Sequence, residues 1–114
     1  MEKDLSIGVL FDFYGSLLTE KQAMAVDYYY NQDFSLSEIA QELQVTRQAA
    51  RDNIARGAEH LREWERKLRA AERFGQVSEH ARQMEALLRQ LPEETDSSVR
   101  KELVEHLRQI RELI

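Results

Sequence analysis

The chain has 114 residues, of which 42% are hydrophobic and 32% are charged, and its formal net charge at pH 7 is −5. This length suits one domain, or a small domain with an appended segment. One proline and four glycines leave long stretches without a helix breaker, so the composition predicts an all-α protein. The absence of cysteine excludes disulfides and thiolate metal sites.

The N-terminal stretch SIGVLFDFYGSLL is apolar, but it does not have the pattern of a secretory signal or a membrane span. Lys3 lies between Glu2 and Asp4, and Asp12 interrupts the apolar run. A signal peptide begins with a basic segment, and a spanning helix needs about 20 apolar residues. We therefore expect a soluble, cytoplasmic protein with no membrane partner.

The charge is unevenly distributed along the chain. Residues 1–46 contain two Lys/Arg and eight Asp/Glu, residues 47–73 contain eight and five, and residues 74–114 contain six and eight. Duplex affinity depends heavily on cationic contacts to phosphate, so only the middle segment is suited to nucleic acid.

Three helices are expected before residue 45. Apolar residues at three-to-four spacing predict the first over residues 5–17. The stretches TEKQ at 19–22 and SLSE at 35–38 are capping-box patterns, in which a hydroxyl accepts from the third backbone N–H of a helix. They predict two further helices, which end near Tyr30 and Leu43.

Gln44 and Val45 are expected to form a turn, after which Thr46 caps a long helix that reaches about Phe74. Gly75 suits the end of this helix. Gly57 lowers helix propensity by about 1 kcal/mol relative to Ala. It either permits close approach of another helix or is tolerated without benefit. The apolar seam that predicts the helix is Ala50, Ile54, Ala58, Leu61, Trp64, Leu68 and Ala71.

Two amphipathic helices are expected over residues 78–91 and 99–113, with the loop PEETD at 92–96 between them. They fold back as a bundle or pack between two chains. We divide the chain into a domain at 1–60 and a helical extension at 61–114, and we expect a homodimer formed chiefly by the extension. The residues expected to contact a second chain or another partner are Leu61, Trp64, Leu68, Leu103, Leu107 and Ile110.

The two helices around the turn at residues 44–45 have the spacing of a helix-turn-helix, whose second helix enters the major groove of DNA. Near the start of that helix Arg47, Gln48, Arg51 and Asp52 occupy the outer face. Arginine pairs with guanine and glutamine with adenine, so these residue types suit base reading.

Phosphate contacts are expected from Arg56 and Arg62, which follow along the same helix. Asp52 opposes DNA binding unless Arg56, four residues on, neutralises it. The competing interpretation is that exposed Arg and Gln are ordinary solvated residues, since helix-turn-helix packing also occurs in protein-binding modules.

No pattern typical of an enzyme is present. The sequence has no nucleophile–base pair, no glycine loop that could hold a phosphate, and no metal-ligand spacing around His60, His80 or His106. We expect no catalysis, cofactor or metal. The aromatic residues Tyr28 to Tyr30 and Trp64 could stack on bases, but a place in the core is the more common use.

Residues 18–62 resemble the fourth region of bacterial sigma factors in the LT..Q opening, the aromatic helix end, the S..EIA block and the VTRQA turn. More closely, YGSLLTEKQ, YYYNQDFSLSEIAQEL and TRQAARDNI resemble the YlxM family of small bacterial helix-turn-helix proteins. Those proteins also have a variable helical C-terminal segment, so the resemblance covers essentially the whole chain. Ala50 departs from the pattern, because many relatives have a larger aliphatic residue there.

The resemblance implies a role in the signal recognition particle pathway, because genes of this family lie beside those of the particle's GTPases. The implied partners are the particle's GTPase or its RNA. An acidic protein suits a basic ribonucleoprotein partner. The alternatives are a transcriptional regulator that reads duplex DNA through the helix starting at Thr46, and a helical bundle that binds other proteins.

Overall fold

The computed structural model describes residues 3–114, which form two compact units. The first unit ends at Ala71 and the second covers Glu72–Ile114. Residues 3–114 contain six α-helices, one 3₁₀ turn, one π-helical turn and no strand, so the all-α prediction is confirmed. The division expected at residue 60 falls inside a helix that continues to Leu68.

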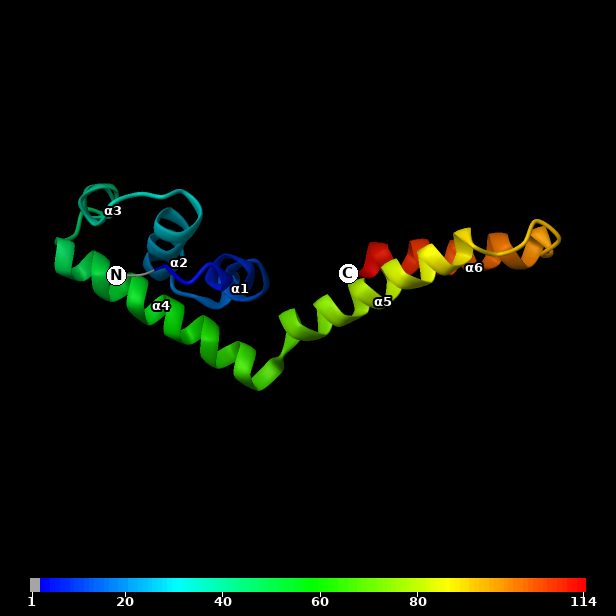
Figure 1. Cartoon of the computed structure of the whole chain (residues 1–114). Helices are drawn as coiled ribbons and strands as arrows, with labels where there is room; N and C mark the ends of the chain where they lie inside the picture. Colours follow the sequence, from blue (N-terminus) through cyan, green and yellow to red (C-terminus); the bar gives the residue numbers. More distant parts are fainter. Residues whose placement is uncertain (1–2) are drawn as a thin grey trace. The chain divides into compact units, whose positions relative to one another are not determined.

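The first unit is built around one long helix. Helix α4 packs against α1, α2 and α3, which lie along it (Figure 1). Helix α1 continues directly into the 3₁₀ turn η1, and α2 continues into the π-helical turn η2. The bounds are α1 Ser6–Tyr14, η1 Gly15–Leu17, α2 Glu20–Val26, η2 Asp27–Asn31, α3 Leu36–Leu43 and α4 Arg47–Leu68.

Both predicted capping boxes form. The Thr19 hydroxyl accepts from the Gln22 N–H at 3.2 Å, and the Ser35 hydroxyl accepts from the Glu38 N–H at 3.1 Å. In each box the side chain at the third position accepts from the N–H of the capping residue. Helix α4 begins in a related way, because the Thr46 hydroxyl accepts from the Ala49 N–H at 3.0 Å. These contacts satisfy backbone donors that a helix start leaves unpaired.

The turn between α3 and α4 depends on Gln44, which adopts a left-handed backbone conformation with φ of 57°. The following Val45 N–H donates to the Ala40 carbonyl at 3.0 Å, which closes the turn. The two helices then meet through a buried cluster near the start of α4. Its members are Ala25, Tyr29, Ile39, Ala40, Leu43, Ala50 and Ile54.

A second buried cluster lies further along α4 and includes α1. Ala58 and Leu61 face inward at this level, next to Val26 of α2. Ala50 is itself fully buried, so the smaller residue at that position is accommodated. The residues that α1 contributes are Ile7, Leu10 and Tyr14.

Gly57 lies where α4 crosses α2. A Cβ atom added there would lie 2.5 Å from Cγ2 of Val26, which is closer than two carbon atoms can approach. The close-approach interpretation of this glycine is therefore confirmed.

The expected single helix from residue 47 to about 74 is wrong. Helix α4 ends at Leu68, Arg69 adopts a left-handed conformation with φ of 55°, and helix α5 (Ala70–Arg89) runs on through Gly75. Nothing lies within 4 Å of the Cβ position of Gly75, so this glycine is simply an exposed helical residue.

Side chains from α1 and α4 explain the break at Arg69. The Tyr14 hydroxyl donates to Oε1 of Glu65 at 2.6 Å and accepts from the Ala70 N–H at 3.0 Å. The Ala71 N–H donates to the same Glu65 oxygen at 3.1 Å. Burial raises the pKa of Tyr14, and the hydrogen bond to Glu65 adds to the effect. The first backbone donors of α5 are thus satisfied by a tertiary contact.

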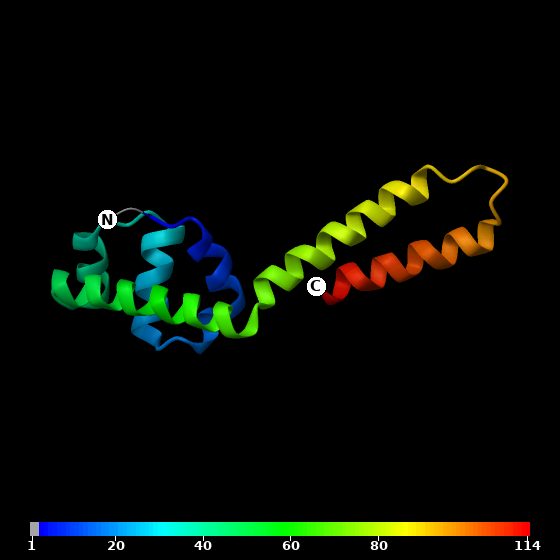
Figure 2. The ribbon, with the colours of Figure 1, turned by 60° about the horizontal axis from the view of Figure 1, so that its bottom comes forward.

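The second unit is an antiparallel hairpin of α5 and α6 (Ser97–Leu113), shown in Figure 2. The Asp96 carboxylate accepts from the Ser98 N–H at 2.8 Å and caps α6. Ala81 of α5 and Leu107 of α6 are buried, and Arg111 is 2.5 Å from Glu85 across the hairpin. The two C-terminal helices therefore pack against each other within one chain.

Within residues 3–114, no helix combines the length and apolar character that a membrane crossing requires. The same residues contain no group of three or more His, Asp or Glu side chains arranged to hold a metal ion.

Candidate nucleic-acid interface

The first turns of α4 present opposite faces to the core and to solvent. Ala50 and Ile54 are fully buried against α2 and α3. The outer face is defined by the residues that the sequence predicts for nucleic-acid contact. All five are exposed: Arg47, Gln48, Arg51, Asp52 and Arg56.

Three guanidinium groups on this face have no partner in the described part of the chain. Arg47, Arg51 and Arg56 make no ion pair and no side-chain hydrogen bond with residues 3–114. An unpaired arginine can give all its donors to an incoming anion. We call these three residues the α4 arginines.

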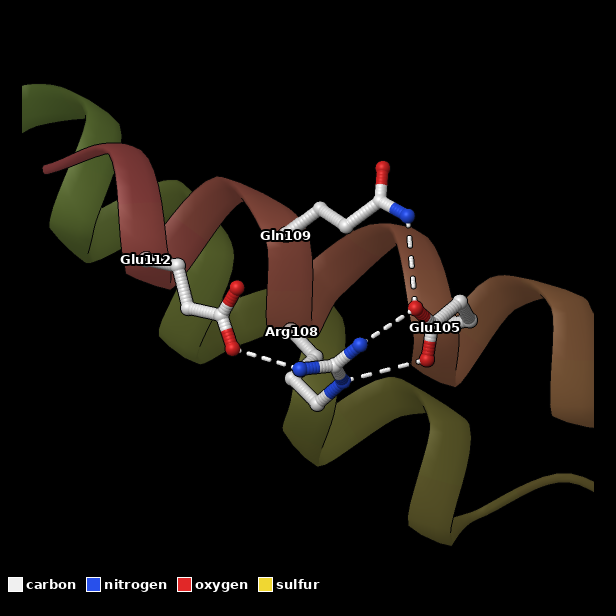
Figure 3. Close-up of polar contacts among 4 residues, drawn as sticks. All are labelled: Glu105, Arg108, Gln109 and Glu112. Carbon is white, nitrogen blue, oxygen red and sulfur yellow. Dashed lines mark hydrogen bonds and ion pairs between the residues drawn. The ribbon is translucent and has the colours of Figure 1, made fainter.

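Arg108 shows the contrasting arrangement. Its guanidinium lies 2.5 Å from Glu105 and 2.5 Å from Glu112, one turn before and one turn after it on α6 (Figure 3). Gln109 donates to Glu105 at 3.2 Å, so that carboxylate is held from two sides (Figure 3). A cation in such a network must exchange existing partners before it can bind phosphate, whereas the α4 arginines need not.

The hydrogen-bond partner of Asp52 differs from the expected one. The Gln48 amide donates to its carboxylate at 3.2 Å, four residues along the helix, in place of the expected neutralisation by Arg56. Gln48 must therefore release Asp52 before its amide can pair with a base.

Arg62 differs from the α4 arginines because it pairs with an acidic residue. Its Nη2 is 3.5 Å from Oδ2 of Asp4, at the start of the first unit. Hydrogen bonds from Ser6, helped by the charge of Arg62, lower the pKa of Asp4. Arg62 thus has an acidic partner, and its expected contact with phosphate requires that pair to open.

The residues expected to contact a second chain have different environments. Leu61 is fully buried in its own unit and Leu107 is 3% exposed within the hairpin, so neither offers surface to a partner. Trp64 is half-buried and stacks on His60, with ring centroids 5.6 Å apart. Leu68 and Leu103 are exposed and Ile110 is half-buried.

The aromatic residues of η2 lie in or against the core. Tyr29 is buried, and Tyr28 stacks on Phe34 with ring centroids 4.7 Å apart. Tyr30 packs against both buried clusters. The preference for a core role over base stacking is confirmed at Tyr29.

The expected contact residues do not include some exposed apolar residues of the hairpin. Met84 and Leu87 of α5, and Val99 of α6, are exposed but were not among the expected contact residues. The signal was present as apolar residues spaced by seven at 77, 84 and 91.

Comparison with known proteins identifies the family. The family model described as "Putative helix-turn-helix protein, YlxM / p13 like" (UPF0122) matches residues 1–109. The chain belongs to this family. A UPF0122 protein of Halalkalibacterium halodurans is 45% identical over 102 residues, which cover 90% of this chain and 87% of that protein.

Two further members of the UPF0122 family show the same similarity over shorter stretches. A protein of Shouchella clausii is 54% identical over 74 residues, which cover 65% of this chain and 68% of that protein. A protein of Listeria monocytogenes serotype 4b is 46% identical over 87 residues, covering 76% of this chain and 79% of that protein. The helix-turn-helix prediction is therefore supported by the family as well as by the turn between α3 and α4.

Proposed function

We propose that this chain is a regulatory protein of the signal recognition particle pathway that acts by binding, and that the α4 arginines contact the RNA of the particle. The family resemblance motivates the pathway. The observation that supports a nucleic-acid partner is the exposure of Arg47, Arg51 and Arg56, whose guanidinium groups have no ion-pair partner among residues 3–114. Phosphate is an anion that exposed arginines bind well.

The geometry of α4 suits a polyanion better than a single small anion. Arg47 and Arg56 are nine residues apart, which is roughly 14 Å along a helix axis. The remainder of the chain is acidic, so it binds phosphate weakly without specificity, and binding depends on the α4 arginines.

The second candidate function is transcriptional regulation through duplex DNA. It is favoured by the position of Arg47, Gln48 and Arg51 in the first turns after the helix-turn-helix turn, where such motifs read bases. The two functions differ in the preferred nucleic acid and in whether binding tolerates competing DNA.

The test is a fluorescence-anisotropy titration of labelled full-length chain with reconstituted signal recognition particle. It is run at about physiological ionic strength, where screening weakens non-specific electrostatic contacts. Random duplex DNA is present in excess as a competitor. We expect saturable binding that survives the competitor. Particle reconstituted without its RNA serves as the reference, and binding should then be lost.

A variant that combines Arg47→Ala, Arg51→Ala and Arg56→Ala tests the proposed surface. We expect its affinity to fall about 10-fold or more, and the log–log salt slope to become shallower by roughly two, since each single-strand phosphate contact contributes about 0.7. The matched control combines Arg73→Ala, Arg89→Ala and Lys101→Ala, which removes equal charge from exposed residues of α5 and α6.

The outcomes separate the candidate functions. Equal loss in the variant and the control would contradict the α4 surface, because bulk charge alone would then explain binding. Binding to the particle that duplex DNA abolishes would favour the transcriptional regulator. Binding to neither nucleic acid would contradict both and leave a protein-binding bundle.

A further inference from the structure

One side of the α5–α6 hairpin is apolar. A hollow of about 260 Å³ opens between the two helices, and every residue that lines it is hydrophobic. We call its lining residues the apolar face: Met84, Leu87, Leu88, Leu91, Leu103 and Leu107.

The other side of the same hairpin carries charged residues. A second hollow of about 350 Å³ is lined there by Glu85, Arg89 and Arg100 together with Leu88, Val104 and Leu107. Arg111 reaches across the hairpin with Nε 2.5 Å and Nη2 2.9 Å from the two Glu85 oxygens. The hairpin thus has the polarity of one layer of a helical bundle, with solvent on one side and a missing layer on the other.

The hairpin buries little by itself. Ala81 and Leu107 are its buried hydrophobic residues, although its helices have 20 and 17 residues. On the apolar face Met84 remains 45% exposed, Leu87 62% and Leu103 39%. Two helices of this length need tertiary packing of their apolar stripes to be stable. A covering layer is therefore required.

We propose that the covering layer is the apolar face of a second copy of this chain, so that two hairpins form a four-helix bundle. Antiparallel hairpins stacked through apolar stripes are a standard route to such a bundle. In a twofold interface the two chains contact each other through the same surface, so that surface must be self-complementary.

The charges around the apolar face meet this requirement. At 100° per residue, the positions from Gln76 to Gln109 that border the face on its open side carry one charged residue, Glu102, among histidines and glutamines. Two identical faces can therefore approach with little like-charge repulsion. A nucleic acid or another highly charged partner would instead require a border of one sign.

Sedimentation equilibrium of the full chain at micromolar concentration tests the proposal. We expect a mass twice the 13.4 kDa of one chain. Leu103→Asp places a charge on the apolar face and should raise the dissociation constant about 100-fold or more, as loss of a central contact does. Val104→Asp is the matched control, because Val104 is 51% exposed and lines the second hollow rather than the apolar face.

Val104→Asp should leave the dimer within about 3-fold of the original affinity, since rim substitutions change binding little. Circular dichroism checks the helix content of each variant. Where Leu103→Asp unfolds the hairpin, Leu103→Ala takes its place and should still weaken the dimer. A monomeric mass for the unaltered chain, or equal effects at 103 and 104, would overturn the proposal.

Discussion

The two units contain similar amphipathic helices but bury them to very different extents. Among residues 3–114, thirteen hydrophobic residues are buried in the first unit, and only Ala81 and Leu107 are buried in the second. Helix α4 packs against three other helices, whereas α5 and α6 lie beside each other in the hairpin (Figure 2). The apolar stripe of α4 is therefore enclosed, and that of the hairpin remains open on one side.

This difference teaches that hydrophobic periodicity identifies a face and not the layer that covers it. Residues at three-to-four spacing occur along α4 and along α6 alike. Leu61 is fully buried because α1 and α2 form a second layer over it, while Leu103 is 39% exposed because no such layer exists in the hairpin. Burial thus depends on topology, which a periodic pattern does not contain.

The largest expected effect comes from making the same substitution in both units. Leu61→Ala should lower the free energy of unfolding by about 2–5 kcal/mol, because it leaves a cavity in a closed core. Leu113→Ala removes a side chain that is 86% exposed and should change stability by no more than about 0.5 kcal/mol. Urea denaturation followed by circular dichroism measures both. Similar effects would contradict the contrast between the units.

The next largest effect comes from a pair of glycine substitutions. They should change the free energy of unfolding in opposite directions in the two units. Gly57→Ala must displace Val26, and such overpacking costs about 1–3 kcal/mol, more than the gain in helix propensity of about 1 kcal/mol. Gly75→Ala meets nothing within 4 Å and should stabilise α5 by about 0.5–1 kcal/mol.

A double-mutant cycle with Val26→Ala sharpens the first half of this prediction. If the Val26 methyl causes the cost, the two substitutions should be coupled by at least about 0.5 kcal/mol. Thermal unfolding of the four proteins provides the cycle. Additive effects would show that the crossing of α2 and α4 adjusts without strain.

The features that could be predicted from the sequence were those fixed by neighbouring residues. The capping residues Thr19, Ser35 and Thr46 lie within three positions of the N–H groups they satisfy, so short patterns identified them. The exposure of Arg47 and Arg51 followed from the positions of Ala50 and Ile54, which mark the inner face of the same helix.

The break at Arg69 could not be predicted because its cause is distant in the sequence. The contact between Tyr14 and Glu65 joins residues 51 positions apart, and it supplies the partners for the first N–H groups of α5. Gly75 carried the local signal for a helix end but lacks any such contact. For the same reason, nothing near the α4 arginines in the sequence indicated that they would have no ion-pair partner in the described part of the chain, whereas Arg62 pairs with Asp4.

The smallest expected effect is a pH dependence that compares one helix cap in each unit. Hydrogen bonds from Ser35 lower the pKa of Glu38, and hydrogen bonds from Ser98 lower the pKa of Asp96. A carboxyl whose folded pKa is lowered stabilises the folded state above its ordinary value. That contribution is lost as the pH falls through the lower folded value.

Glu38→Gln keeps an oxygen that can accept from the Ser35 N–H but removes the titration. Stability of the first unit should then fall less steeply below the ordinary Glu pKa of 4.5. Asp96→Asn should change the stability of α6 alone, because α6 does not pack in an enclosed core. Amide hydrogen exchange between pH 5 and about pH 3 resolves the two responses, because it reports opening of each helix separately. If Asp96→Asn altered the protection of α4 as strongly as Glu38→Gln does, the units would unfold together, and the hairpin would depend on the first unit rather than on a second chain.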